Sequence, residues 1–190
     1  EKGGFEHFMM KEIHEQPKVV EDTLNSVLKD GKIDLTEVGL TEEEMKEISQ
    51  IYIVACGSAW HVGMVAQYVI EDLAKIPVRV ELASEFRYRK PLLDKNGLVI
   101  LISQSGETAD TLAALREAKN RQVKTLAIVN VVGSSIAREA DNVFYTLAGP
   151  EISVATTKAY SAQLIAIYTL ALQFAKERNE IEMPEYEKLI

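Results

Sequence analysis

The densest group of polar side chains in this sequence is the run Ser103-Gln104-Ser105-Gly106-Glu107-Thr108. The serines, Gln104 and Thr108 can all donate hydrogen bonds, and the helix expected to start here adds unpaired backbone N–H groups. Gly106 has no side chain, so a ligand can approach the backbone closely. Such a loop can hold a phosphate without lysine or arginine, each hydrogen bond to the dianion contributing about 1.5–3 kcal/mol. The alternative is that the hydroxyls only cap the helix, but the position of the loop after an apolar run favours a ligand.

A second polar turn, Cys56-Gly57-Ser58-Ala59, also follows an apolar run. Gly57 permits a tight turn, and Ser58 is expected to cap the next helix and to face the same pocket. We interpret Cys56 as a small core residue rather than as a nucleophile, since free cysteines are most often buried.

A third polar turn, over residues 149–158, leads into the last helix. Ser153, Thr156 and Thr157 are expected to cap that helix, with its N-terminus facing the ligand. Lys158 invites a Schiff-base interpretation, but the sequence shows no sign of the desolvated pocket that this chemistry needs, so we favour a structural or electrostatic role. Residues 131–135, after the predicted fourth strand, are a weaker candidate for the rim of the same ligand site.

Several classes of function are excluded or disfavoured by the rest of the chain. A formal net charge of −8 over 190 residues argues against binding to nucleic acid. Neither the dinucleotide glycine pattern nor a P-loop occurs, so we expect no cofactor. We also expect no metal, because the three histidines have no metal-ligand spacing. No residue pair stands out as a general acid and base, and residues 81–89 are interpreted as a structural ion-pair cluster.

The elements that position these turns follow from the hydrophobic pattern. Apolar runs predict strands over residues 51–55, 78–82, 98–102, 125–129 and 143–147. Patterns with helical spacing lie between them and predict helices over residues 58–75, 107–120, 135–140 and 156–178. This alternation predicts an α/β fold, a three-layer α-β-α sandwich with a five-stranded parallel sheet. Ligands of such sheets bind beyond the carboxyl ends of the strands.

The two ends of the chain predict further helices. Residues 5–13 and 17–28 are expected to form two helices, with Pro17 opening the second and Asp30-Gly31 ending it. Thr41 and Glu44 form a capping box for a short helix. We divide the chain into a helical segment (1–48), a ligand-binding α/β domain (49–178) and the start of a linker (179–190), and both ends look cut from a longer protein. Residues 159–175 are uncharged but are interpreted as a buried helix, not a membrane span.

These motifs resemble a known family. The run 103–111 is similar to the sugar-phosphate loop of sugar isomerase (SIS) domains, which have a flavodoxin-like fold. Longer stretches resemble one enzyme family with such domains, the isomerising glutamine–fructose-6-phosphate aminotransferases. The matching stretches are Gly4-Phe5-Glu6-His7, Lys11-Glu12-Ile13, Glu15-Gln16-Pro17, Ala55-Cys56-Gly57, Ala83-Ser84-Glu85-Phe86-Arg87-Tyr88-Arg89, Val132-Gly133-Ser134-Ser135, Ala155 and Thr157-Lys158-Ala159.

The resemblance implies a sugar-phosphate-binding half of an enzyme that makes glucosamine 6-phosphate from fructose 6-phosphate and glutamine ammonia. It implies phosphate contacts from Ser103, Gln104, Ser105 and Thr108, with Ser58, Val154 and Thr156 bordering the sugar. It also implies a homodimer in the cytoplasm, joined to a glutaminase domain and a second SIS domain that hold the catalytic residues, so this chain alone is expected to be inactive.

Three departures from the family's pattern concern the pocket. Ala59 and Trp60 stand where the family usually has a hydroxyl residue and a smaller or tyrosyl aromatic, and Thr156 replaces a serine but keeps the hydroxyl. Two other interpretations stay open. One is a non-catalytic SIS sensor of sugar phosphates, which the acidic charge disfavours, and the other is a dimerisation scaffold built on the last helix, which is compatible with binding.

Overall fold

The apolar, β-branched runs of the sequence form one parallel sheet. In the computed structural model, which describes residues 1–190, its strand order is β4-β3-β5-β6-β7. The strands are β3 (Gln50–Ala55), β4 (Val78–Leu82), β5 (Gly97–Ser103), β6 (Lys124–Val129) and β7 (Asn142–Tyr145). All neighbouring pairs are parallel. The predicted five-stranded parallel sheet is therefore confirmed, with its first strand inside the sheet as in flavodoxin-like folds.

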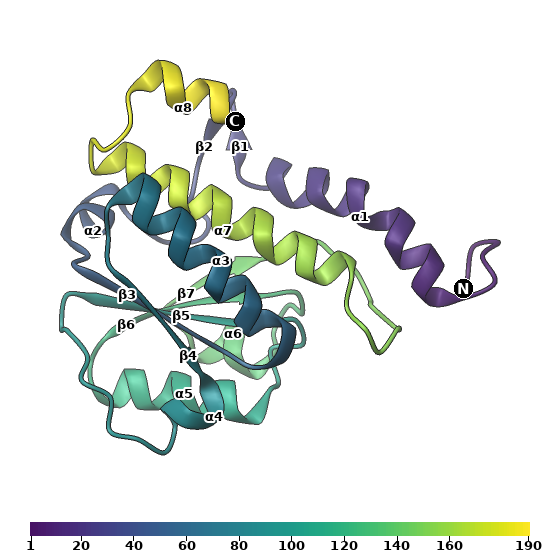
Figure 1. The fold of residues 1–190 in the computed structure, drawn as a ribbon, viewed down its shortest axis with the longest axis horizontal. Helices are drawn as coiled ribbons and strands as arrows, with labels where there is room; N and C mark the ends of the chain where they lie inside the picture. Colours follow the sequence, from purple (N-terminus) through teal and green to yellow (C-terminus); the bar gives the residue numbers. More distant parts are fainter.

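Helices cover both faces of the sheet, which completes the three predicted layers (Figure 1). On one face lie α3 (Gly57–Ala74) and α7 (Lys158–Glu177). On the other lie α4 (Ala83–Phe86), α5 (Ala109–Asn120) and α6 (Ser135–Glu139). Successive strand side chains point to opposite faces, so Ile51 and Ile53 pack with the first layer and Tyr52 and Val54 with the second.

The N-terminal segment forms one helix where the sequence predicted two. α1 (Phe8–Asn25) runs through Pro17 without a break. Proline has no N–H to donate to the carbonyl of Ile13, which would leave that carbonyl unpaired. The Gln16 side chain compensates, since its Nε2 donates to the Ile13 carbonyl at 3.2 Å. The prediction failed because it treated Pro17 as a helix start and overlooked this local replacement.

A short hairpin and a short capped helix connect α1 to the sheet. The hairpin, β1 (Leu28–Lys29) and β2 (Lys32–Ile33), was not predicted. Its turn is Asp30-Gly31, both with positive φ, a sequence typical of two-residue hairpins that we had interpreted only as a helix end. α2 (Glu42–Glu47) begins with the predicted capping box between Thr41 and Glu44, which is confirmed.

The C-terminal helices close the first layer. α8 (Met183–Leu189) buries Tyr186 completely, and the Tyr186 hydroxyl donates to Gln173 Oε1 of α7 at 3.0 Å. The same hydroxyl accepts the Ile33 N–H at 3.1 Å and so joins the hairpin to both helices. α7 is largely buried, as predicted for residues 159–175. None of the helices combines the length and the apolar character that crossing a bilayer requires.

Candidate functional site

Two of the polar turns meet where the strand order reverses. The chain leaves β3 for β4 on one side and then returns to β5 on the other, so the turns after β3 and β5 are neighbours. Ala55 pairs with Ile102, and Cys56 and Ser103 follow them at the carboxyl edge. The Thr111 hydroxyl, in the first turn of α5, contacts Cys56 Sγ at 3.9 Å. This edge is the place where open α/β sheets bind ligands.

The β5 loop (residues 103–108) is held by its own hydroxyls. Ser103 Oγ accepts the Gly106 N–H at 3.0 Å and lies 2.9 Å from Thr108 Oγ1. Ser105 Oγ accepts the Glu107 N–H at 3.2 Å. Gly106 has φ +67°, a left-handed conformation that glycine adopts without strain. The hydroxyl oxygens therefore shape the loop.

Donors remain available after these contacts are made. A hydroxyl that accepts a hydrogen bond keeps its own hydrogen, so the Ser105 O–H is free to donate. Ser103 and Thr108 share one hydrogen between them, which leaves the other for a ligand. Thr108 is the N-cap of α5 but makes no side-chain cap. The two serine hydroxyls thus bond amides within the loop, and Thr108 bonds Ser103. None of them bonds the first turn of α5, contrary to the capping alternative.

The β6 side of the sheet anchors the β5 loop. The Ile136 N–H donates to the Gly106 carbonyl at 3.0 Å, and the Ser135 N–H donates to Glu107 Oε1 at 2.7 Å. The bond from the Ser135 backbone lowers the pKa of the Glu107 carboxyl, so it stays charged and turned toward α6. Residues 131–135, predicted as a weak part of the rim, therefore support the loop through Ser135.

Glu107→Ala is expected to weaken the binding of an anionic ligand because the loop loses this anchor. The loss of one charge-assisted hydrogen bond should raise the dissociation constant of the anionic ligand about tenfold or more. Glu107→Gln, which keeps an acceptor oxygen, should lose less. Titration calorimetry of both variants measures the difference, and equal affinities for Glu107→Ala and the unchanged chain would contradict the assigned role.

Charge around the first turn of α5 is balanced. Asp110 lies in that turn, and Arg87 Nη1 donates to Asp110 Oδ1 at 2.6 Å. Without this partner the carboxylate would repel an anion at the helix start. The cluster of residues 81–89 is thus structural in part, as predicted, since Arg89 pairs with Glu81. Arg87, however, also neutralises Asp110 at the edge of the site.

The turn after β3 differs from its prediction in one detail. α3 begins at Gly57 with Cys56 as its N-cap, and no side chain caps it. Ser58 lies inside the first turn and is exposed, so the expectation that Ser58 caps the helix is wrong. Its exposed place at the edge leaves it available to a ligand. Ala59 is buried, and Cys56 is half-buried and packs against the core on the α5 side of the sheet.

The β7 loop (residues 146–157) bonds to its own carboxylate just before α7 begins. Glu151 Oε1 accepts the Thr157 N–H at 2.6 Å, and Glu151 Oε2 accepts the Thr156 hydroxyl at 2.9 Å. α7 has Thr157 as N-cap without a side-chain cap. The prediction that Ser153, Thr156 and Thr157 cap this helix is wrong, because no side chain bonds the first-turn amides of α7. The hydroxyls of Thr156 and Thr157 donate to Glu151 instead.

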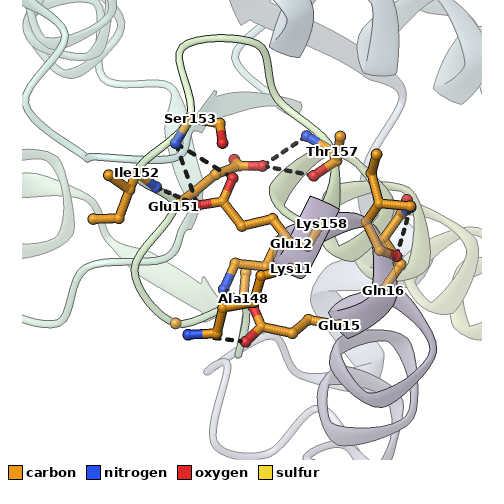
Figure 2. Close-up of polar contacts among 12 residues, drawn as sticks. Lys11, Glu12, Glu15, Gln16, Ala148, Glu151, Ile152, Ser153, Thr157 and Lys158 are labelled. Atoms are coloured by element: carbon orange, nitrogen blue, oxygen red, sulfur yellow. Dashed lines mark hydrogen bonds and ion pairs between the residues drawn. The ribbon is translucent and has the colours of Figure 1, made fainter. Parts of the chain in front are cut away.

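Carboxylates of α1 hold the β7 loop from outside (Figure 2). Glu12 Oε1 accepts the N–H groups of Ile152 at 2.6 Å and Ser153 at 3.2 Å. Glu15 Oε2 accepts from Lys158 Nζ at 2.7 Å, and Lys158 is buried. These partners support the structural role predicted for Lys158. Sequence reasoning missed both carboxylates, since partners more than a hundred residues away leave no mark in local spacing.

Acid is expected to release these contacts. Burial raises the pKa of Glu12, but hydrogen bonds from Ser153 and Ile152 and the charge of Lys158 outweigh it and hold the pKa below its ordinary value of 4.5. The hydrogen bond from Lys158 likewise lowers the pKa of Glu15. A carboxyl group whose pKa is lowered in the folded state stabilises the fold at any pH above its ordinary pKa. This stability is lost as the pH falls through the lowered pKa of the folded state.

Denaturant unfolding between about pH 6 and about pH 3 measures this loss. We expect the free energy of unfolding to decrease below about pH 4.5, and to decrease less in Glu12→Gln. Identical pH dependence in the variant and in the unchanged chain would contradict a contribution from Glu12.

Asn130 connects the two loops. Its N–H donates to the Gln104 carbonyl at 3.1 Å. Its Oδ1 accepts the Ala148 N–H and its Nδ2 donates to the Gly149 carbonyl, both at 2.9 Å. Sequence reasoning did not single out Asn130, although a polar residue directly after β6 was a signal. The site therefore offers neutral donors and a helix start on a fixed edge, a donor set suited to a phosphate.

Comparison with known proteins places these features in context. The sequence model of the SIS domain family matches residues 44–173 of this chain. Glutamine–fructose-6-phosphate aminotransferase [isomerizing] of Clostridium tetani is 60% identical over all 190 residues of the chain, and that of Clostridium acetobutylicum is 57% identical. The chain spans 31% of the length of each of these relatives.

A solved structure is also similar to this chain. The C-terminal domain of glucosamine-fructose-6-phosphate aminotransferase from Francisella tularensis superposes with a TM-score of 0.95 at 44% identity. The match covers 99% of this chain and 53% of that one.

Proposed function

This chain belongs to the SIS domain family, and from that membership we propose that it binds a phosphorylated sugar at the carboxyl edge of its sheet. The observation that carries the proposal is the β5 loop. There Ser105 and the Ser103–Thr108 hydroxyl pair keep hydrogens to donate, beside a start of α5 that no side chain caps. These are the groups that a phosphate dianion needs.

We assign the phosphate to the β5 loop rather than to the β7 loop. Just before α7 the carboxylate of Glu151 already accepts the Thr157 N–H and the hydroxyls of Thr156 and Thr157. Glu12 accepts two further amides of this loop, those of Ile152 and Ser153. Two negative charges within hydrogen-bonding distance of those amides oppose a second anion. Sugar hydroxyls are neutral and are tolerated there.

The sugar is then bordered by residues of the other two turns. Ser58 is exposed at the start of α3, and the Val154 side chain is fully exposed at the tip of the β7 loop. Thr156 donates to Glu151, and its oxygen remains able to accept a bond from a sugar hydroxyl. Gln104 faces the same edge, with its carbonyl fixed by Asn130.

In its whole-protein context we propose that the chain is the first SIS domain of an isomerising glutamine–fructose-6-phosphate aminotransferase. Its ligands are then fructose 6-phosphate and glucosamine 6-phosphate, and the enzyme is a cytoplasmic homodimer. A glutaminase domain and a second SIS domain supply the catalytic residues, so this chain binds without turnover. The sensor alternative is not favoured, because the relatives similar over the whole chain carry an aminotransferase name.

Titration calorimetry with glucosamine 6-phosphate and fructose 6-phosphate tests the binding. We expect saturable heat, and a dissociation constant about tenfold higher in Ser105→Ala. Ser26→Ala is the matched control, because the Ser26 hydroxyl bonds only the Thr23 carbonyl within α1. No saturable heat at millimolar ligand, or equal binding by Ser105→Ala and the control, would overturn the proposal.

A further inference from the structure

One stripe of α1 lies along the β7 loop and the start of α7. Its residues recur at helical spacing and are Glu12, Glu15, Gln16, Val19 and Thr23. Thr23 Oγ1 accepts the Leu147 N–H at 3.1 Å, Val19 packs among the alanines at 148, 159 and 162, and Gln16 Oε1 accepts the Ser161 hydroxyl at 2.6 Å. The stripe thus contacts the segment from Leu147 to Ser161 along its length.

Glu12 is the member of the stripe that reaches the middle of the β7 loop. Its side chain is buried, with 2% of the residue exposed, although it is ionisable. Its carboxylate accepts the N–H groups of Ile152 and Ser153, which no other side chain of the protein pairs (Figure 2). Charge-assisted bonds of this kind are stronger than neutral ones, so they fix the backbone of these two residues.

The positions fixed by Glu12 adjoin those that border the sugar. Val154 follows Ser153 directly, and the loop is fixed at its other end by Asn130, which also holds the β5 loop. Between Gly149 and α7 the β7 loop also bonds to itself through Glu151. Glu12 therefore sets where this internally bonded unit lies relative to the phosphate-binding β5 loop.

We propose that Glu12 is a positioning residue for the sugar part of the ligand, acting through the backbone of residues 152–153. The inference rests on the proposed function and deepens it. The phosphate is held by the β5 loop, which Glu12 does not touch, and the sugar is read by the turn that Glu12 holds. Glu12 thus affects discrimination between a sugar phosphate and a bare phosphate.

The test compares Glu12→Ala and Glu12→Gln with Glu21→Gln, an exposed glutamate of the same helix. Hydrogen exchange reports the amides of residues 152–153 and of the β5 loop. Calorimetry gives the affinity for glucosamine 6-phosphate, and amide chemical shifts at residues 105–106 give the affinity for inorganic phosphate. If Glu12→Ala fails to fold, Glu12→Gln carries the test alone.

In Glu12→Ala we expect the amides of residues 152–153 to exchange at least about tenfold faster, with the β5 loop unchanged. The dissociation constant for glucosamine 6-phosphate should rise about tenfold while that for inorganic phosphate stays within about twofold. Glu12→Gln should lie between Glu12→Ala and the unchanged chain, since it keeps an acceptor without the charge.

Unchanged exchange at residues 152–153, or equal weakening of both ligands, would overturn the positioning role. The second outcome would indicate a general loss of structure. If the unchanged chain binds no sugar phosphate, the proposed function fails first and the inference falls with it. If it binds and the Glu12 variants bind equally well, only the inference fails.

Discussion

Gly106→Ala is expected to abolish measurable sugar-phosphate binding and to lower the free energy of unfolding by about 2–6 kcal/mol. Gly106 has φ +67°, and a Cβ added there would lie 2.0 Å from Ser134 Oγ and 2.5 Å from Ser134 Cβ. Ser134 is 3% exposed, so it has little room to retreat. Left-handed strain contributes about 1–3 kcal/mol, and overpacking contributes a similar amount.

Gly31→Ala is the matched control for backbone strain. Gly31 has φ +73° in the β1–β2 turn, and a Cβ there meets open space. It should lose only the strain and bind ligand normally. Chemical denaturation and calorimetry of both variants separate the effect of backbone strain from that of overpacking against Ser134. Should Gly106→Ala match Gly31→Ala in stability and affinity, the close packing of the β5 loop against Ser134 would have to be rejected.

Glu15→Ala is expected to cost about 2–3 kcal/mol of stability, because it leaves a buried ammonium without its partner. The Lys158 side chain is 6% exposed, whereas that of Glu15 is 33% exposed. Breaking a fully buried pair costs about 3–5 kcal/mol, and we discount this range for the solvent that reaches Glu15. The loss should appear in denaturant unfolding at neutral pH.

The double variant Glu15→Ala/Lys158→Met distinguishes a stranded charge from lost packing. Removing both charges should restore most of the stability, since an unpaired buried charge is the main cost. Glu21→Ala, on the exposed side of α1, should be nearly neutral. If the double variant is as unstable as Glu15→Ala, the ammonium of Lys158 is not the cause.

The sheet and its helices could be predicted because their signals are local. A strand buried on both faces must be apolar over its length, and short apolar runs such as residues 51–55 and 98–102 indicate strands of this kind. The capping box at Thr41 is equally local, since both partners lie within four residues. The same reasoning placed the β5 loop at the carboxyl edge, where it lies in the structure.

The contacts that organise the site were harder to predict. Glu12 binds Ile152 from 140 positions away, and Asn130 binds both Gln104 and Gly149, so neither pairing is visible in helical or strand spacing. Hydroxyls near a helix start also suggest capping whether or not they cap. No side chain caps the first turn of either α5 or α7, and at α7 the threonine hydroxyls donate to Glu151 instead.

This difference between two helix starts explains why a phosphate is expected in one place. Both α5 and α7 begin at the same edge of the sheet with threonine as N-cap. The carboxylate of Glu151 bonds the N–H of the N-cap residue of α7 and opposes an anion there. At α5, by contrast, the acidic residue in the first turn is paired with Arg87, and Glu107 is turned toward α6. The start of α5, beside Ser105, is therefore the one that favours an anion.

A crystal of this chain soaked with glucosamine 6-phosphate tests the central claim most directly. We predict phosphate density within hydrogen-bonding distance of Ser105 Oγ, of the Ser103–Thr108 hydroxyl pair and of the first-turn amides of α5, with the sugar ring extending toward Val154. Phosphate bound at the β7 loop, or a β5 loop whose hydroxyl hydrogens all point into the protein and leave the anion without a partner, would contradict it.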